Sequence, residues 1–64
     1  MLSEYDVFVL NREIPGVPVG TIGVVLMVLG GTPRSYEVEF PDNVGGNFGD
    51  EITYTLTEDF MNRR

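Results

Sequence analysis

The chain has 64 residues and a formal net charge of −6, from ten acidic side chains against four arginines. It contains no cysteine, histidine or lysine. These absences exclude disulfides, thiolate or imidazole metal sites and the commonest general bases. Clustered Lys and Arg, which phosphate binding needs, are also missing. We therefore expect a single domain, residues 1–64, that is not an enzyme, uses no cofactor and binds neither nucleic acid nor a small-molecule substrate.

No segment suits export or membrane insertion. The longest apolar run, Val24 to Leu29, is far shorter than the ~20 residues of a spanning helix. The acidic N-terminal residues lack the basic region that begins a signal peptide. The sequence thus predicts a cytoplasmic protein without a membrane partner.

The first half of the chain predicts two strands around a loop. Residues 5–10 are β-branched and aromatic, with Phe8 and Leu10 on one face and apolar residues on the other as well, so both faces are expected to be partly covered. Residues 11–20 contain two prolines and two glycines and predict a loop that folds over an open end of the core. Residues 21–29 predict the second strand, in which Gly23 indicates a bulge or a sharp bend.

The second half predicts two further strands. Residues 35–40 alternate, with Tyr36 and Val38 facing inward and Glu37 and Glu39 outward. A glycine-rich loop over residues 41–49 leads to a fourth strand over residues 50–56. Residues 57–61 are expected to form one helical turn that places Phe60 on the core, and residues 62–64 a frayed tail.

Few residues offer chemistry. Ser3 and Ser35 have no base to activate them, so we interpret both as turn and strand-end residues. The pair Glu37 and Glu39 could act in acid–base catalysis, but without a pocket it is better explained as a solvated face. Four oxygen donors could bind calcium, but their spacing matches no EF-hand loop, and we predict no metal site. These donors are Asp42, Asn43, Asp50 and Glu51.

The second strand carries the strongest functional signal, because residues 24–29 are apolar without interruption. If Leu26 and Val28 point into the core, alternate residues must point outward. Antiparallel pairing with the third strand then sets acidic residues beside that outward stripe. An apolar patch with an acidic rim is typical of an interaction surface. The predicted partner-binding residues are Val25, Met27, Leu29, Glu37 and Glu39.

Several segments together carry a family resemblance. Residues 6–10 followed by Gly20-Thr21-Ile22-Gly23-Val24-Val25 look like the bent first hairpin of KOW-type barrels, and residues 36–40 and 56–60 extend the match. The chain resembles a family of very short, uncharacterised bacterial proteins, a domain of unknown function. The resemblance implies an all-β, small SH3-like barrel of four to five antiparallel strands, with a short helical turn near the C-terminus. It implies a bacterial, cytoplasmic origin and no particular activity.

The leading hypothesis is a non-catalytic protein–protein interaction module that binds a partner protein or forms a homodimer. A first alternative is an acidic inhibitor, either antitoxin-like or immunity-like or a nucleic-acid mimic. It rests on the net charge and on the loop acids Asp42, Asp50 and Glu51. A second alternative is a KOW-like nucleic-acid-binding domain, which rests on fold analogy and is disfavoured by the charge. The apolar stripe on the second strand could also be covered by the loop of residues 11–20.

Overall fold

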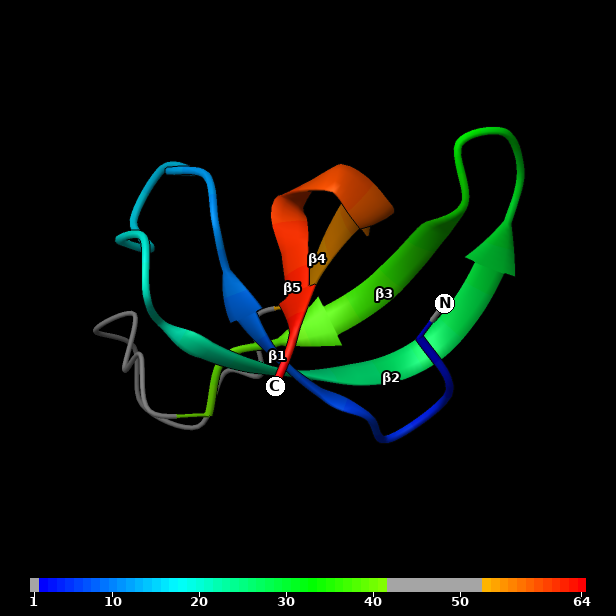
Figure 1. The fold of residues 1–64 in the computed structure, drawn as a ribbon, viewed down its shortest axis with the longest axis horizontal. Coiled ribbons are helices and arrows are strands. Elements are labelled where there is room, and N and C mark those ends of the chain that lie inside the picture. The colour runs from blue at the N-terminus through cyan, green and yellow to red at the C-terminus, as the bar shows by residue number, and fades with distance from the viewer. Residues whose placement is uncertain (1, 42–52) are drawn as a thin grey trace.

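A computed structural model describes residues 2–41 and 53–64, which form one five-stranded antiparallel sheet (Figure 1). The strand order across the sheet is β4-β3-β2-β1-β5. The short 3-10 turn η1 separates the last two strands. The bounds are β1 Val7–Leu10, β2 Ile22–Gly30, β3 Ser35–Glu39, β4 Thr53–Thr57, η1 Glu58–Phe60 and β5 Met61–Arg63.

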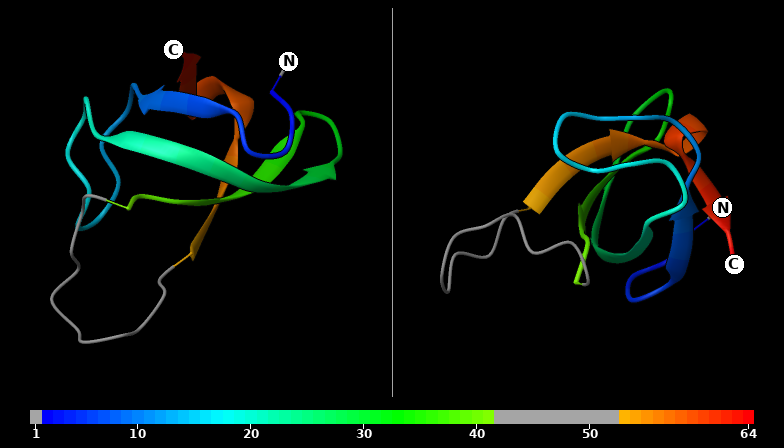
Figure 2. Two further views of the ribbon diagram at one scale, coloured as in Figure 1. Left: turned by 90° about the horizontal axis from the view of Figure 1, so that it is seen from below. Right: turned by 90° about the vertical axis from the view of Figure 1, so that its left-hand side faces the viewer.

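The chain passes through β1 to β4 so that each strand pairs with the one before it, and β5 then returns to the free side of β1. Figure 2 shows the sheet curving around its inner side, with the loop of residues 11–20 at one end. The predicted all-β class, the antiparallel pairing and the helical turn near the C-terminus are confirmed. The predicted fourth strand is confirmed from Thr53 onward, and its first three residues lie outside the described residues.

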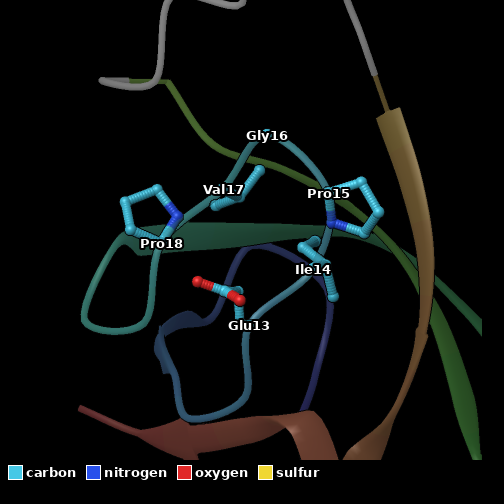
Figure 3. A pocket seen from close by; sticks show the side chains of 6 residues that line it. All are labelled: Glu13, Ile14, Pro15, Gly16, Val17 and Pro18. Atoms are coloured by element: carbon cyan, nitrogen blue, oxygen red, sulfur yellow. The ribbon is translucent and has the colours of Figure 1, made fainter.

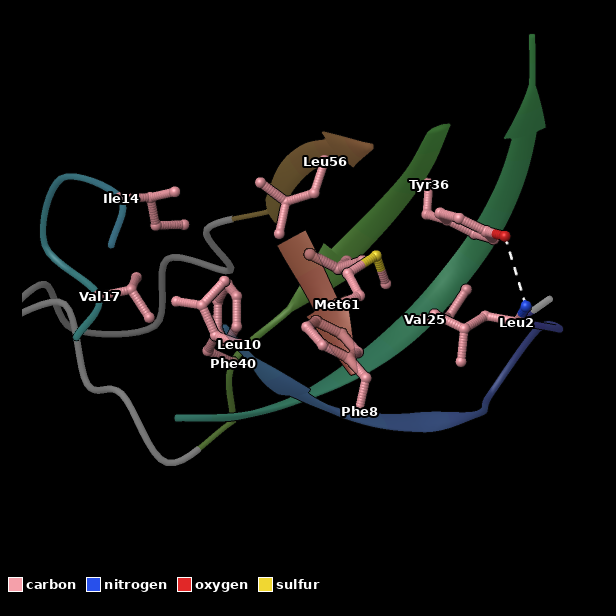
Figure 4. Close-up of a cluster of buried hydrophobic side chains, with 11 residues drawn as sticks. Leu2, Phe8, Leu10, Ile14, Val17, Val25, Tyr36, Phe40, Leu56 and Met61 are labelled. Carbon is pink, nitrogen blue, oxygen red and sulfur yellow. Dashed lines mark hydrogen bonds between the residues drawn. The ribbon is translucent and has the colours of Figure 1, made fainter. Parts of the chain in front are cut away.

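The core fills the inner side of this curved sheet (Figure 4). The inward alternation predicted for β3 is confirmed, because Tyr36 and Val38 are fully buried. Phe40 makes edge-to-face contacts with Phe8 and Tyr54, at centroid distances of 5.7 and 5.4 Å. The buried residues are Leu2, Phe8, Leu10, Ile14, Val17, Val25, Tyr36, Val38, Phe40, Leu56 and Met61.

The loop of residues 11–20 closes one end of the core, as expected. Ile14 and Val17 form an isolated antiparallel bridge, and both side chains are buried in the core. Val19, by contrast, is exposed. In Figure 1 this loop lies at the opposite end of β2 from the hairpin that joins β2 to β3. The loop therefore does not cover the C-terminal half of β2.

Two local predictions differ from the structure. Gly23 was expected to mark a bulge or a sharp bend, and the bulge is absent, because Gly23 lies in regular register opposite Phe8. Its missing side chain instead makes room for the Phe8 ring, which an added Cβ would overlap. Residues 62–64 were expected to fray, yet Asn62 and Arg63 belong to β5, which pairs with β1. This strand is short and polar, and its partner lies at the other end of the chain, so its own sequence carries no strand signal.

A set of polar contacts ties the start of the loop to the C-terminal segment. The Asn11 backbone N–H donates to the Phe60 carbonyl at 2.9 Å, and the Asn11 side-chain amide donates to Asn62 Oδ1 at 2.9 Å. Arg12 lies over the Phe60 ring, 5.4 Å from its centroid, and pairs with Asp59 at 3.3 Å. Phe60 is thereby held against the core, as the sequence predicts.

Candidate protein-binding face

The outer side of the sheet carries a band of apolar side chains. Residues directly opposite each other in an antiparallel pair share a face. Because Phe8 and Val25 point into the core, their neighbours in β1 and β2 lie on the outer side. Cross-strand pairs Val7↔Val24 and Val9↔Ile22 build this band, and Met27 extends it. We name these five residues the outer band: Val7, Val9, Ile22, Val24 and Met27.

An acidic rim borders the outer band on β3. Glu37 lies directly opposite Met27, and Glu39 directly opposite Val24. The predicted placement of acidic residues beside the Met27 stripe is therefore confirmed. Beyond them, β4 places Thr55 opposite Glu37 and Thr53 opposite Glu39. The outer side thus changes from apolar to acidic to neutral polar across three neighbouring strands.

The outward position predicted for Val25 is wrong. Val25 has 0% exposure and pairs with the inward-facing Val38. Simple alternation fails here because the register of β2 against β3 shifts between Val25 and Met27 and again between Val28 and Gly30. Each shift adds a residue to β2, so Met27 and Leu29 are exposed, at 54% and 47%, as predicted. Val28, which was expected to point inward, lies opposite the inward-facing Tyr36, yet it is 38% exposed.

The exposed large apolar side chains are concentrated near this part of β2. Among the described residues there are six, and only Val19 lies elsewhere, in the loop at the far end. Tyr5 lies beside this part of β2, because its N–H donates to the Val25 carbonyl at 2.7 Å. A gathering of exposed apolar side chains on so small a domain is typical of a contact surface. The other members are Val7, Met27, Val28 and Leu29.

Comparison of the chain with protein-family models, curated proteins and solved structures finds no match. Within residues 2–41 and 53–64 there is also no group of three or more acidic side chains placed to hold a metal ion. The oxygen donors Asp42, Asn43, Asp50 and Glu51, which the sequence analysis singled out, lie outside the described residues. None of the helices in the described part of the chain is long and apolar enough to span a membrane.

The remaining candidate sites have simpler structural explanations. The Ser35 hydroxyl donates to the Gly30 carbonyl at 2.9 Å and closes the hairpin between β2 and β3, while the Ser3 N–H donates to Asp6 Oδ2 in a turn. A hollow in the loop is lined by six consecutive residues, of which Glu13 alone is charged (Figure 3). A second hollow places Asp6 beside Arg63, 3.6 Å apart in an ion pair. Neither hollow brings together a nucleophile and a base.

Proposed function

We propose that the protein is a non-catalytic protein–protein interaction module that docks a partner on the outer band. A single observation carries this proposal: one side of the sheet presents apolar side chains from two strands beside an acidic rim. Antiparallel sheets that face water on one side normally alternate apolar and polar residues, so that the outer side is polar. Here the outer side of β1 and β2 is apolar at every position of their shared register.

Charge indicates the chemistry of the partner. Glu37 and Glu39 lie on the same side as the outer band, and the whole chain carries a net charge of −6. Complementary potentials steer association and suppress wrong partners. The partner surface is therefore apolar with flanking basic residues. Nucleic acid does not fit this description, because its phosphates would meet the acidic rim.

The fold that supports this function is, in our proposal, a small SH3-like barrel. The support is the connection pattern: a meander of four strands, a 3-10 turn, and a last strand that returns to pair with the first. Such a barrel presents its outer side as a fixed surface, because its core is filled from within. Fold alone does not select a function, so the proposal depends on the outer band and its rim.

The test uses two synthetic amphipathic peptides of matched length, one alternating leucine with lysine and one alternating leucine with glutamate. We expect the wild-type protein to bind the lysine peptide, more weakly as salt rises, and not the glutamate peptide. Glu37→Lys should reduce affinity for the lysine peptide about tenfold, whereas Glu13→Lys should not, although both change the net charge equally. Glu13 lies in the loop at the far end of the sheet.

Two outcomes would overturn the proposal. If the two charge reversals weaken binding equally, the peptide responds to net charge and not to the acidic rim. If neither peptide binds at low salt, the outer band is not a docking surface for apolar and basic segments.

A further inference from the structure

One edge of β2 has no partner strand over half its length. β1 pairs only with residues Ile22 to Val24, and the last bonds on that side join Val25 to Tyr5 and Asp6, at 2.7 and 2.9 Å. Among residues 2–41 and 53–64, no strand pairs with residues 26–30 on this side. In Figure 1, β2 extends well past the turn at residues 3–6 toward the hairpin. An unpaired edge presents free N–H and C=O groups to another chain.

This open edge, residues 26–30, has neither the charged side chains nor the prolines that commonly block an exposed strand. Natural edges are blocked by charged side chains, by proline, by β-bulges or by being very short. The sequence of the open edge is Leu-Met-Val-Leu-Gly, and Met27, Val28 and Leu29 are exposed. The two register shifts of β2 against β3 fall within this segment. Tyr5, at 71% exposure, lies where the edge begins. Pairing with another strand would satisfy the backbone groups of this apolar edge and remove them from water.

Charged side chains at the two ends of the open edge indicate which chain pairs with it. Glu4 lies in the turn where the edge begins, next to Tyr5, and Arg34 is the last residue of the hairpin where the edge ends, next to β3, with its carbonyl accepting from the Glu58 N–H. Neither takes part in the ion pairs found among the described residues, Arg12–Asp59 and Arg63–Asp6. When two copies of the edge pair antiparallel about a two-fold axis, the beginning of each meets the end of the other. Glu4 of each copy then lies beside Arg34 of its partner.

Repulsion between the acidic rims does not prevent this pairing. Glu37 lies on β3, one strand away from the open edge. In the paired arrangement, the two copies of Glu37 are separated by three interstrand spacings of about 4.8 Å, or ~14 Å. This distance exceeds the Debye length of ~8 Å at physiological ionic strength, so most of the repulsion is screened.

We propose that the protein forms a two-fold symmetric dimer in which the open edges of two β2 strands pair antiparallel and join both sheets into one of ten strands. The dimer uses the backbone groups of residues 26–30 and the Glu4–Arg34 contacts, whereas partner docking uses the side chains of the outer band, and Met27 alone belongs to both. Charge reversals at Glu4 and Arg34 test the first proposal, and charge reversal at Glu37 tests the second.

The test measures the mass of the full chain in solution by sedimentation, together with amide hydrogen exchange. We expect the wild-type mass to be that of a dimer. Glu4→Arg and Arg34→Glu should each weaken the dimer about tenfold, because each replaces two attractive contacts with repulsive ones. An equimolar mixture of these two variants should restore the dimer, since each contact in the mixed dimer again joins one acidic and one basic side chain. Glu13→Arg, in the distant loop, is the matched control and should leave the mass unchanged.

Hydrogen exchange locates the interface independently of these variants. Amides of residues 26–30 that point to the open side should exchange more slowly as protein concentration rises, while the circular dichroism spectrum stays constant. A wild-type monomer at all concentrations would overturn the proposal. A dimer that both charge variants leave intact, or a mixture that stays monomeric, would overturn the two-fold register. Glu37→Lys, which tests the acidic rim, should leave the dimer unchanged, so failure of one proposal is distinguishable from failure of the other.

Discussion

Replacing Gly23 by alanine tests how tightly the first hairpin packs. A Cβ at this position would lie 2.5 Å from Phe8 Cε1 and 2.9 Å from Phe8 Cε2, and closer still to Cζ. Real Cβ atoms do not approach so closely, so the ring has to move. Phe8 has no exposed surface and is held against Phe40, which limits where it can go. Gly23→Ala is therefore an overpacking substitution in the centre of the core.

The expected change in the free energy of unfolding for Gly23→Ala follows from two opposing effects. Overpacking a core typically costs about 1–3 kcal/mol. Removing a glycine restricts the unfolded chain and returns about 0.4–1 kcal/mol, because Gly23 lies in a regular strand that alanine can adopt. We expect a net loss of about 1–2 kcal/mol in the free energy of unfolding. A domain of this size has only about 3–10 kcal/mol in total, so the loss is easily measured.

Urea unfolding of four proteins provides the assay: wild type, Gly23→Ala, Phe8→Leu and the double variant. Phe8→Leu shrinks the side chain that blocks the new methyl group, so the double variant should lose at least about 0.5 kcal/mol less than the sum of the single losses. Gly30→Ala is the control, because Gly30 has a positive φ of 84° with no heavy atom near the added Cβ. Its cost is backbone strain, which Phe8→Leu should not relieve. Additive losses for Gly23 and Phe8 would refute the packing explanation.

Three further predictions concern single side chains. Met27→Glu should change the free energy of unfolding by less than about 1 kcal/mol and abolish binding of the lysine peptide, whereas Val25→Glu should unfold the protein, as circular dichroism would report; equal effects would contradict the assignment of the two faces. Thr57→Val should raise the pKa of the Asp59 carboxyl, followed by carbon NMR, because the Thr57 hydroxyl is the main group that lowers this pKa below its usual 3.8. The lowered pKa means that the Thr57–Asp59 contact stabilises the fold above that usual value and is lost as the pH falls through the folded pKa, so an unchanged titration would disprove the contact. Tyr5→Asn should stabilise the fold by up to about 1 kcal/mol in thermal unfolding, since Tyr5 is exposed with a left-handed φ of 68°, and a loss would contradict this.

Sequence patterns predict those strands in which apolar and polar residues alternate and the apolar residues are the ones that face the core. β3 is the clearest case, because Tyr36 and Val38 alternate with two glutamates that the core could not accept. β2 has no such contrast, since every residue from Val24 to Leu29 is apolar. Its two register shifts depend on how β3 pairs with it: Gly30, with a positive φ of 84°, marks the second, but no residue in β2 marks the first. The inward position of Val25 therefore could not be derived from β2 alone.

The candidate site, too, has a part that the sequence predicts and a part that it does not. The exposure of Met27 and Leu29 and the position of Glu37 follow from pairing two adjacent strands, which the tight turn between them indicates. The part of the outer band that β1 supplies depends on the register of β1 against β2, across a ten-residue loop whose length does not fix it. One signal was present in the sequence: Val7 and Val9 make the second face of β1 apolar when a solvated strand would place polar residues there.

The pairing of β5 with β1 sets the order in which the chain can fold during its synthesis. Leu10 and Met61 are register partners, and both are buried in the core. At 5–20 residues per second, the ribosome needs roughly 3–10 s to proceed from one to the other. The hairpin of β2 and β3 can form within microseconds of its emergence, but β1 keeps a free edge throughout this interval. On the ribosome, the nascent chain therefore exposes the unpaired side of β1 until residues 61–63 emerge, and a chaperone that binds extended apolar segments has its opportunity there.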